Sequence, residues 1–125
     1  MYFVGRIDRE IYKCIAEDIV TDEVVITDNQ IQHIRERHLD AYEQAVKLLY
    51  AAIADPDYII RDKHPNSGLI IKRIKTETSY IQLVLRICTE SDAPNYKNSI
   101  ISCWKISENR LNNYLRNKEI LYRKL

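Results

Sequence analysis

The run Tyr80–Cys88 is the feature that most constrains how this chain can fold. Every second position in it is apolar, and the apolar set is Ile81, Leu83, Leu85 and Ile87. A period of two residues is typical of a β-strand that turns one face to a core. This segment therefore predicts a strand, and with it a sheet to which other segments must contribute.

Several other segments have the pattern of strands. Leu69–Lys75 and Ser99–Ile106 are two further long candidates. In Ser99–Ile106, strict alternation would place four residues on one face: Ile100, Ser102, Trp104 and Ile106. The shorter candidates are Val24–Ile26, Tyr58–Arg61 and Glu119–Arg123.

Helical spacing of apolar residues dominates the first half of the chain. It predicts a helix over Asp8–Ile19 and a second helix that begins at Thr27. Thr27 is followed three residues later by Gln30, which is the pattern of a capping box. A third helix is predicted over Ala41–Ala54, and Asp55-Pro56 ends it because proline disfavours helical backbone at the residue before it.

Helices first and antiparallel strands afterwards predict an α+β fold, with N-terminal helices packed on one face of the sheet. A short helix at about Glu108–Arg116 and a last strand close the chain. At 125 residues the chain fits one domain, 1–125. No apolar run approaches the roughly 20 residues of a membrane helix, so no membrane partner is expected.

The cysteines indicate a reducing compartment. Cys14, Cys88 and Cys103 are odd in number and show no Cys-x-x-Cys spacing. Free cysteines in apolar segments behave as small buried hydrophobes, and we interpret these three as structural. The expected location is the cytoplasm, either of the host or of a target cell.

Charge is divided unevenly along the chain. Residues 1–62 contain 7 Lys and Arg against 13 Asp and Glu, whereas residues 63–125 contain 12 against 5. The C-terminal half could therefore present a positive face to a polyanion. Alternatively, both halves solvate their surfaces and attract each other, and charge alone does not separate these interpretations.

The second predicted helix contains His33, Arg37 and His38 within six residues. At about 100° per residue, His38 shares the apolar stripe of Ile31 and Ile34, whereas His33 and Arg37 border it. The two histidines are five positions apart, so their side chains diverge and no metal site is expected. They are candidates for acid–base catalysis. The alternative is a hydrogen-bonded core histidine and a surface histidine.

Charged side chains in the predicted strands could complete a site. Lys72 and Arg86 interrupt apolar runs, and a cation inside a sheet needs a reason. Together they would form a basic face that stabilises charge on a phosphate, or else a face open to water. Further candidates for catalysis or substrate binding are Ser102, Trp104, Tyr122 and Lys124. For Trp104 the simpler interpretation is a core residue, and the functional one is stacking on a base.

Histidines combined with lysine and arginine are the groups that metal-free RNA cleavage needs. One side chain takes the proton of the 2′-OH, which attacks the adjacent phosphate, and another protonates the leaving 5′-oxygen. Histidine suits both steps because its unperturbed pKa is about 6.5, and such help contributes roughly 10²–10⁴-fold. The residue inventory is compatible with this chemistry but does not distinguish it from a structural role.

Five blocks of sequence, taken in order, resemble a known family. They are Asp22–Thr27 with His33-Ile34-x-x-Arg37-His38, then Asp55–Ile59, Leu69–Lys72, Asn98–Ser102 and Ile120–Lys124. In this order they resemble the phage-type nuclease domains of the barnase–EndoU–colicin–RelE fold. Such domains occur in phage and mobile-element proteins and as toxin modules. The resemblance runs from about Val4 to the C-terminus.

The resemblance implies N-terminal helices on a four-stranded antiparallel sheet, and a metal-independent ribonuclease that needs no cofactor. It places the site between the histidine helix and the sheet. The residues it implies are His33, Arg37, His38, Lys72 and Ser102, and less directly Arg86 and Tyr122. Ser102 stands where the family more often has threonine, but it keeps the hydroxyl.

The same resemblance implies RNA as substrate, with tRNA among the candidates, and a cognate antitoxin or immunity protein as partner. Two alternatives remain open. The first is a non-catalytic RNA- or protein-binding module of a phage or mobile element, and the second is an RNA-binding repressor of its own operon.

Overall fold

The computed structural model describes residues 1–37, 42–75 and 78–125. Its strands are β1 (Tyr2–Arg6), β2 (Glu23–Ile26), β3 (Tyr58–Arg61), β4 (Ser67–Arg73), β5 (Tyr80–Arg86), β6 (Asn98–Ile106) and β7 (Ile120–Arg123). Its helices are α1 (Arg9–Tyr12), α2 (Asp28–Arg37), α3 (Tyr42–Ala54) and α4 (Glu108–Asn117). No helix among the described residues is long and apolar enough to cross a membrane.

Across the described residues the strands form one sheet in the order β1-β2-β6-β5-β4-β3-β7. The mixed α+β architecture is therefore confirmed, but the four-stranded antiparallel sheet is wrong in detail. The sheet has seven strands, and β2 pairs parallel with β6. Three of the short strands, β2, β3 and β7, correspond to the short candidates in the sequence, so it is the count of four implied by the resemblance that is wrong.

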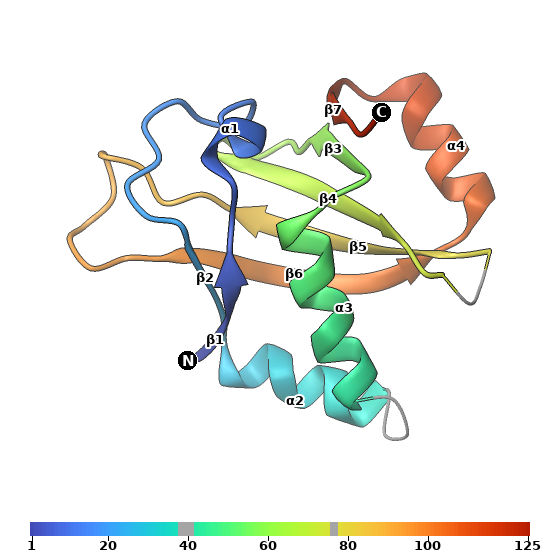
Figure 1. The fold of residues 1–125 in the computed structure, drawn as a ribbon, viewed down its shortest axis with the longest axis horizontal. Coiled ribbons are helices and arrows are strands. Elements are labelled where there is room, and N and C mark those ends of the chain that lie inside the picture. The colour runs from blue at the N-terminus through green and yellow to red at the C-terminus, as the bar shows by residue number, and fades with distance from the viewer. Residues whose placement is uncertain (38–41, 76–77) are drawn as a thin grey trace.

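The helices lie on both faces of this sheet (Figure 1). On one face, α2 and α3 cover the larger apolar core, which includes Ile70, Leu83 and Leu85. On the other, Leu111 of α4 packs with a smaller cluster that includes Ile60, Leu69 and Ile71. We call these the α3 face and the α4 face. The expectation that the helices pack on one face holds only for the N-terminal ones.

The helix predicted over Asp8–Ile19 is shorter than expected. α1 ends at Tyr12, whose ring is fully buried and whose hydroxyl donates to the Ile53 carbonyl at 2.8 Å. The chain then turns, and Ile19 forms an isolated bridge with Thr89. The apolar residues beyond Tyr12 pack into the core from a turn segment instead of a helix, since Ala16 and Ile19 are both buried there.

The other helix boundaries follow the local chemistry. Thr27 caps α2, since its hydroxyl accepts the backbone N–H of Gln30 at 3.2 Å. α3 ends at Ala54, and the buried Pro56 follows two residues later. The predicted starts and ends of these two helices are therefore confirmed where the structure describes them.

A β-bulge divides the faces of β6. Val84 of β5 pairs with Ser102, but Leu85 pairs with Ile100, so Ile101 is an extra residue. As a result Ile100 lies on the α3 face, whereas Trp104 lies on the α4 face with Ser102. The prediction that Ile100, Ser102, Trp104 and Ile106 share one face is wrong for Ile100, because an inserted residue reverses the alternation.

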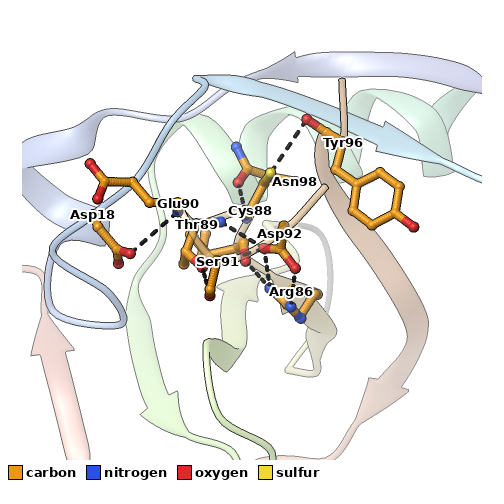
Figure 2. Close-up of polar contacts among 10 residues, drawn as sticks. Asp18, Arg86, Cys88, Thr89, Glu90, Ser91, Asp92, Tyr96 and Asn98 are labelled. Atoms are coloured by element: carbon orange, nitrogen blue, oxygen red, sulfur yellow. Dashed lines mark hydrogen bonds and ion pairs between the residues drawn. The ribbon is translucent and has the colours of Figure 1, made fainter. Parts of the chain in front are cut away.

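Asn98 ties three segments together at the start of β6. Its side chain is fully buried, and its Oδ1 accepts the backbone N–H of Cys88 at 2.8 Å (Figure 2). Its Nδ2 donates to the carbonyls of Thr21 and Glu23 at 2.8 and 3.0 Å. These bonds hold the segment that follows β5 and the start of β2 to the beginning of β6, beside the parallel β2–β6 pair. In the block Asn98–Ser102, one of the five that carry the family resemblance, Asn98 therefore has a structural role.

Replacing Asn98 by alanine should lower the free energy of unfolding by about 3 kcal/mol, because one buried and two partly buried backbone groups lose their partner. Urea denaturation at neutral pH measures this. Asn112→Ala is the control: Asn112 is exposed on α4, and its replacement should change stability by about 0.5 kcal/mol or less. Equal stabilities for the two variants would contradict this role of Asn98.

Candidate functional site

A hollow of about 450 Å³ lies at the edge of the sheet where β4 and β7 end and β3 and β5 begin. We call it the strand-end hollow. Its lining contains four cations, two tyrosines and one side-chain carboxylate: Lys72, Arg73, Lys75, Lys124, Tyr58, Tyr80 and Asp57, with Leu125 completing it. The excess of cations makes it suited to an anionic ligand.

The turn between α3 and β3 shapes the floor of the hollow. The backbone N–H of Asp57 donates to the Ile71 carbonyl at 2.9 Å, and the Asp57 carbonyl accepts from the Lys124 backbone at 2.9 Å. The Asp57 carboxylate accepts the backbone N–H of Arg73 at 2.7 Å. Asp57 therefore fixes the last residues of β4 and the residue after β7 relative to each other.

Lys72 clamps the same turn from the α3 face. Its side chain is only 12% exposed. The Nζ donates to the Asp55 carbonyl at 2.7 Å and lies 3.3 Å from Asp55 Oδ2 and 3.7 Å from Asp57 Oδ1. Lys124 Nζ contacts the same Asp55 Oδ2 at 2.5 Å. Two lysines and two aspartates thus neutralise one another.

The pKa values of this cluster follow from the ion pairs. The hydrogen bond from Lys124 lowers the pKa of the Asp55 carboxyl, and Lys72 adds to the effect while partial burial opposes it. The hydrogen bond to Asp55 raises the pKa of Lys124 in turn. Lys124 therefore keeps its proton at neutral pH and is suited to stabilising negative charge, but not to acting as a general base.

Arg73 and Lys75 are the cations of the hollow that remain available. Both are exposed, and no ion pair to either is formed within the described residues. An exposed guanidinium can bind a phosphate through two parallel hydrogen bonds, and an ammonium can bind it as a point charge. These two side chains are the best placed to contact a phosphate in the hollow.

Tyr58 and Tyr80 give the hollow aromatic walls. Both rings are half-buried in the cluster on the α4 face. Tyr80 is paired in register with Arg73, and the Arg123 guanidinium carbon lies 5.5 Å from the Tyr58 ring centroid. Aromatic rings beside cations are a common arrangement for stacking unpaired bases.

Arg86 is not part of this site. Lys72 pairs with Ile81 on the α3 face, whereas Arg86 lies on the α4 face at the other end of β5. Its guanidinium binds the Asp92 carboxylate at 2.7 and 3.2 Å and also contacts the Ile87 carbonyl (Figure 2). The Thr89 backbone N–H, together with Arg86, lowers the pKa of Asp92. Arg86 therefore orders the loop after β5, and the structure does not bring it near Lys72.

The other strand candidates are divided in the same way. Ser102 is half-buried on the α4 face opposite Val84, and Trp104 packs in the cluster beneath α4. Tyr122 is half-buried against the core of the α3 face. None of these three lines the strand-end hollow, so Lys72 and Lys124 are the two sequence candidates that the structure brings together there.

The helix motif is described only in part. His33 is exposed on α2 and does not line the hollow. Arg37 is the last residue of α2, but its side chain lies outside the described part, and His38 lies outside the described residues altogether. Among the described residues, no group of three or more His, Cys, Asp and Glu side chains is arranged to hold a metal ion.

The sequence interpretation missed Arg73, Lys75, Tyr58 and Tyr80. A signal for two of them is present, because Lys72, Arg73 and Lys75 form a basic run at the end of a predicted strand. The tyrosines gave no such signal, since tyrosine is common in strands. Their meeting in one hollow depends on the antiparallel register of β3, β4 and β5.

Comparison with known proteins adds one match. A family model described as phage-Barnase-EndoU-ColicinE5/D-RelE like nuclease2 matches residues 4–123. No curated protein and no solved structure matches the chain. The match extends from within β1 to the end of β7, and so includes the strands that build the strand-end hollow.

Asp55→Asn should destabilise the protein at neutral pH, and the difference from wild type should shrink in acid. The folded-state pKa of Asp55 lies below its ordinary value of 3.8, so its stabilising contribution is present above pH 3.8 and is lost as the pH falls through the folded-state pKa. Urea unfolding across a pH series measures the difference. Glu17→Gln, at an exposed position without a described ion pair, is the control. If the difference in free energy of unfolding between Asp55→Asn and wild type stays constant as the pH falls well below 3.8, the ion-pair assignment is contradicted.

Proposed function

This chain belongs to the phage-Barnase-EndoU-ColicinE5/D-RelE like nuclease2 family, and on that premise we propose that it is a toxin-type endoribonuclease that cleaves RNA without a metal ion. A nuclease of this type acts on nucleic acid and, as a toxin, would be restrained by an antitoxin or immunity protein. A tRNA is among the substrates to be tested.

The strand-end hollow is the observation that carries this proposal. Arg73 and Lys75 are exposed cations in a hollow whose other lysines are already paired. Cations fixed beside a phosphate stabilise the charge that develops on its oxygens in the transition state, and removing one such group typically costs about 10²–10³-fold in rate. Their scaffold is rigid, since Asp57 bonds to both β4 and the segment after β7.

The proposed reaction is an internal transfer at phosphorus. A base removes the proton of the 2′-OH, the 2′-oxygen bonds to phosphorus, and the bond from phosphorus to the 5′-oxygen breaks. An acid then gives its proton to that leaving oxygen. The products are a 2′,3′-cyclic phosphate and a 5′-hydroxyl. We assign the proton transfers to His33 and His38, with Arg37 as a further cation beside them.

This assignment carries a geometric requirement. His33 is exposed on α2 and does not line the hollow, so the assignment requires that RNA binding bring α2 and the cations of the hollow to the same phosphate. Proton transfer needs hydrogen-bond reach, directly or through one water. The same observation favours the second candidate function, a non-catalytic RNA-binding module that uses the hollow to hold phosphates.

Purified protein should cleave total RNA or a tRNA pool in the presence of EDTA and leave 2′,3′-cyclic phosphate ends. Arg73→Gln/Lys75→Gln should reduce the rate by about 10²-fold or more, because two phosphate contacts are lost. His33→Ala and His38→Ala should each reduce it by roughly 10²–10⁴-fold. Lys47→Gln, at an exposed position on α3, is the control and should keep the wild-type rate.

The outcomes separate the alternatives. Full activity in both histidine variants with loss in Arg73→Gln/Lys75→Gln would make the histidine assignment wrong and keep the hollow as the site. Activity abolished by EDTA and restored by magnesium would contradict the metal-free mechanism. A folded wild type that binds RNA through Arg73 and Lys75 but cleaves no RNA would establish the binding module instead.

A further inference from the structure

The outward surface of α4 has an unusual composition. Four of its ten residues are asparagine and two are arginine, and its one acidic residue, Glu108, is in the first turn. Asparagine is a poor helix former, so this surface is not optimised for helix stability. The helix is held instead by the Ser107 cap and by burial of Leu111. A solvated helix face more often mixes acidic and basic side chains.

Arg110, Tyr114 and Lys118 form a stripe along one flank of α4, which we call the α4 stripe. They are spaced four residues apart, so they lie one above the other on the helix. Arg110 Nε donates to the Tyr114 hydroxyl at 3.1 Å, and its guanidinium carbon lies 5.8 Å from the ring centroid. Lys118 Nζ lies 5.5 Å from the same centroid. The stripe is therefore an aromatic ring flanked by two cations.

The α4 stripe and the strand-end hollow are linked by one apolar cluster on the α4 face of the sheet. Tyr114 packs in the same apolar cluster as Tyr58 and Tyr80, the two tyrosines of the hollow. Arg123 of β7 lies over Tyr58, and the short connection of Lys118 and Glu119 joins α4 to β7 (Figure 1). The path from the hollow to α4 thus repeats one arrangement, a half-buried tyrosine with a cation over its ring.

The cations of this path are not neutralised along α4. Glu119 follows the helix, but its carboxylate is paired with Arg61. Arg110 and Lys118 are exposed, and no carboxylate is paired with either in the part of the chain that the structure describes. A polyanion that already occupies the hollow would gain further contacts by continuing over this surface.

We propose that the α4 stripe is a second RNA subsite, which binds the continuation of a single strand whose scissile region lies in the strand-end hollow. Arg110 and Lys118 contact phosphates, and an unpaired base stacks on Tyr114. The strand is single because a ring can stack on a base only when that base has left a duplex. The proposal rests on the proposed function, which identifies the polymer as RNA. It adds that the RNA is single-stranded and that it continues from the hollow over α4.

The test is binding as a function of length, with 2′-O-methyl oligouridylates that cannot be cleaved. Strands of about 12 nucleotides should reach α4, whereas strands of about four should fill the hollow alone. Arg110→Gln/Lys118→Gln should weaken binding of the longer strand about tenfold and lower the slope of log affinity against log salt by about 1.4, which corresponds to two phosphates. Binding of the shorter strand should change less than about twofold. Fluorescence anisotropy measures each value.

Lys47→Gln/Lys63→Gln removes the same charge from two exposed positions outside the path and is the matched control. Tyr114→Leu should weaken binding of the longer strand because the stacking ring is lost. Tyr114→Phe keeps the ring and should keep the wild-type affinity. An equal loss in the control pair, or no loss in the α4 pair, would overturn the subsite. Equal affinity for a duplex of the same length would overturn its single-strand form.

Failure of the two proposals can be told apart. If wild type cleaves no RNA but Arg110→Gln/Lys118→Gln still weakens binding of the longer strand selectively, the proposed ribonuclease activity is wrong and the α4 subsite stands. If wild type cleaves RNA and Arg110→Gln/Lys118→Gln binds the longer strand with wild-type affinity, the ribonuclease activity stands and the α4 subsite is wrong.

Discussion

Lys72 reaches from β4 to the end of α3 and holds the turn at Asp55 that joins the helix layer to the sheet. Lys124, the residue after β7, contacts the same Asp55 Oδ2 as Lys72 does. Asp57 adds backbone bonds to β4 and to the same terminal segment. The ends of β4 and β7 and the start of β3 are thereby fixed at one edge, and the strand-end hollow exists because they cannot separate. Removing the central ion pairs would loosen α3, the sheet edge and the hollow together.

Once that edge is fixed, alternation decides which side chains can act together. Side chains separated by one residue lie on the same face of a strand, and neighbours lie on opposite faces. Lys72 and Arg86 therefore cannot share a phosphate, although both interrupt apolar runs in the sequence. The Ile101 bulge makes a similar division within β6. The cations that do meet come from strand ends and loops, where both faces are accessible from one hollow.

The sequence predicted those parts of the fold that have a strong local signal. The alternation in β5, the Thr27 cap and the stop at Pro56 are all local, and all are confirmed. The prediction missed β1 because its pairing with β2 is interrupted by a register shift that breaks the alternation. In the site, Lys72 and Lys124 were found but Arg73 and Tyr80 were not, since strand register brings them together. No pattern within one segment encodes a register between segments.

The uneven charge of the chain finds its explanation in these pairings. Acidic residues of the first half neutralise particular cations of the second: Glu23 pairs with Lys97, and Asp55 with Lys72 and Lys124. The two halves thus attract each other, as one interpretation of the charge pattern held. This attraction consumes only some of the cations. Those left without a described ion pair include Arg73, Lys75, Arg110 and Lys118, and they lie in the hollow and on α4. The pairing therefore leaves positive charge available in the hollow and on α4, where the proposed binding of a polyanion would need it.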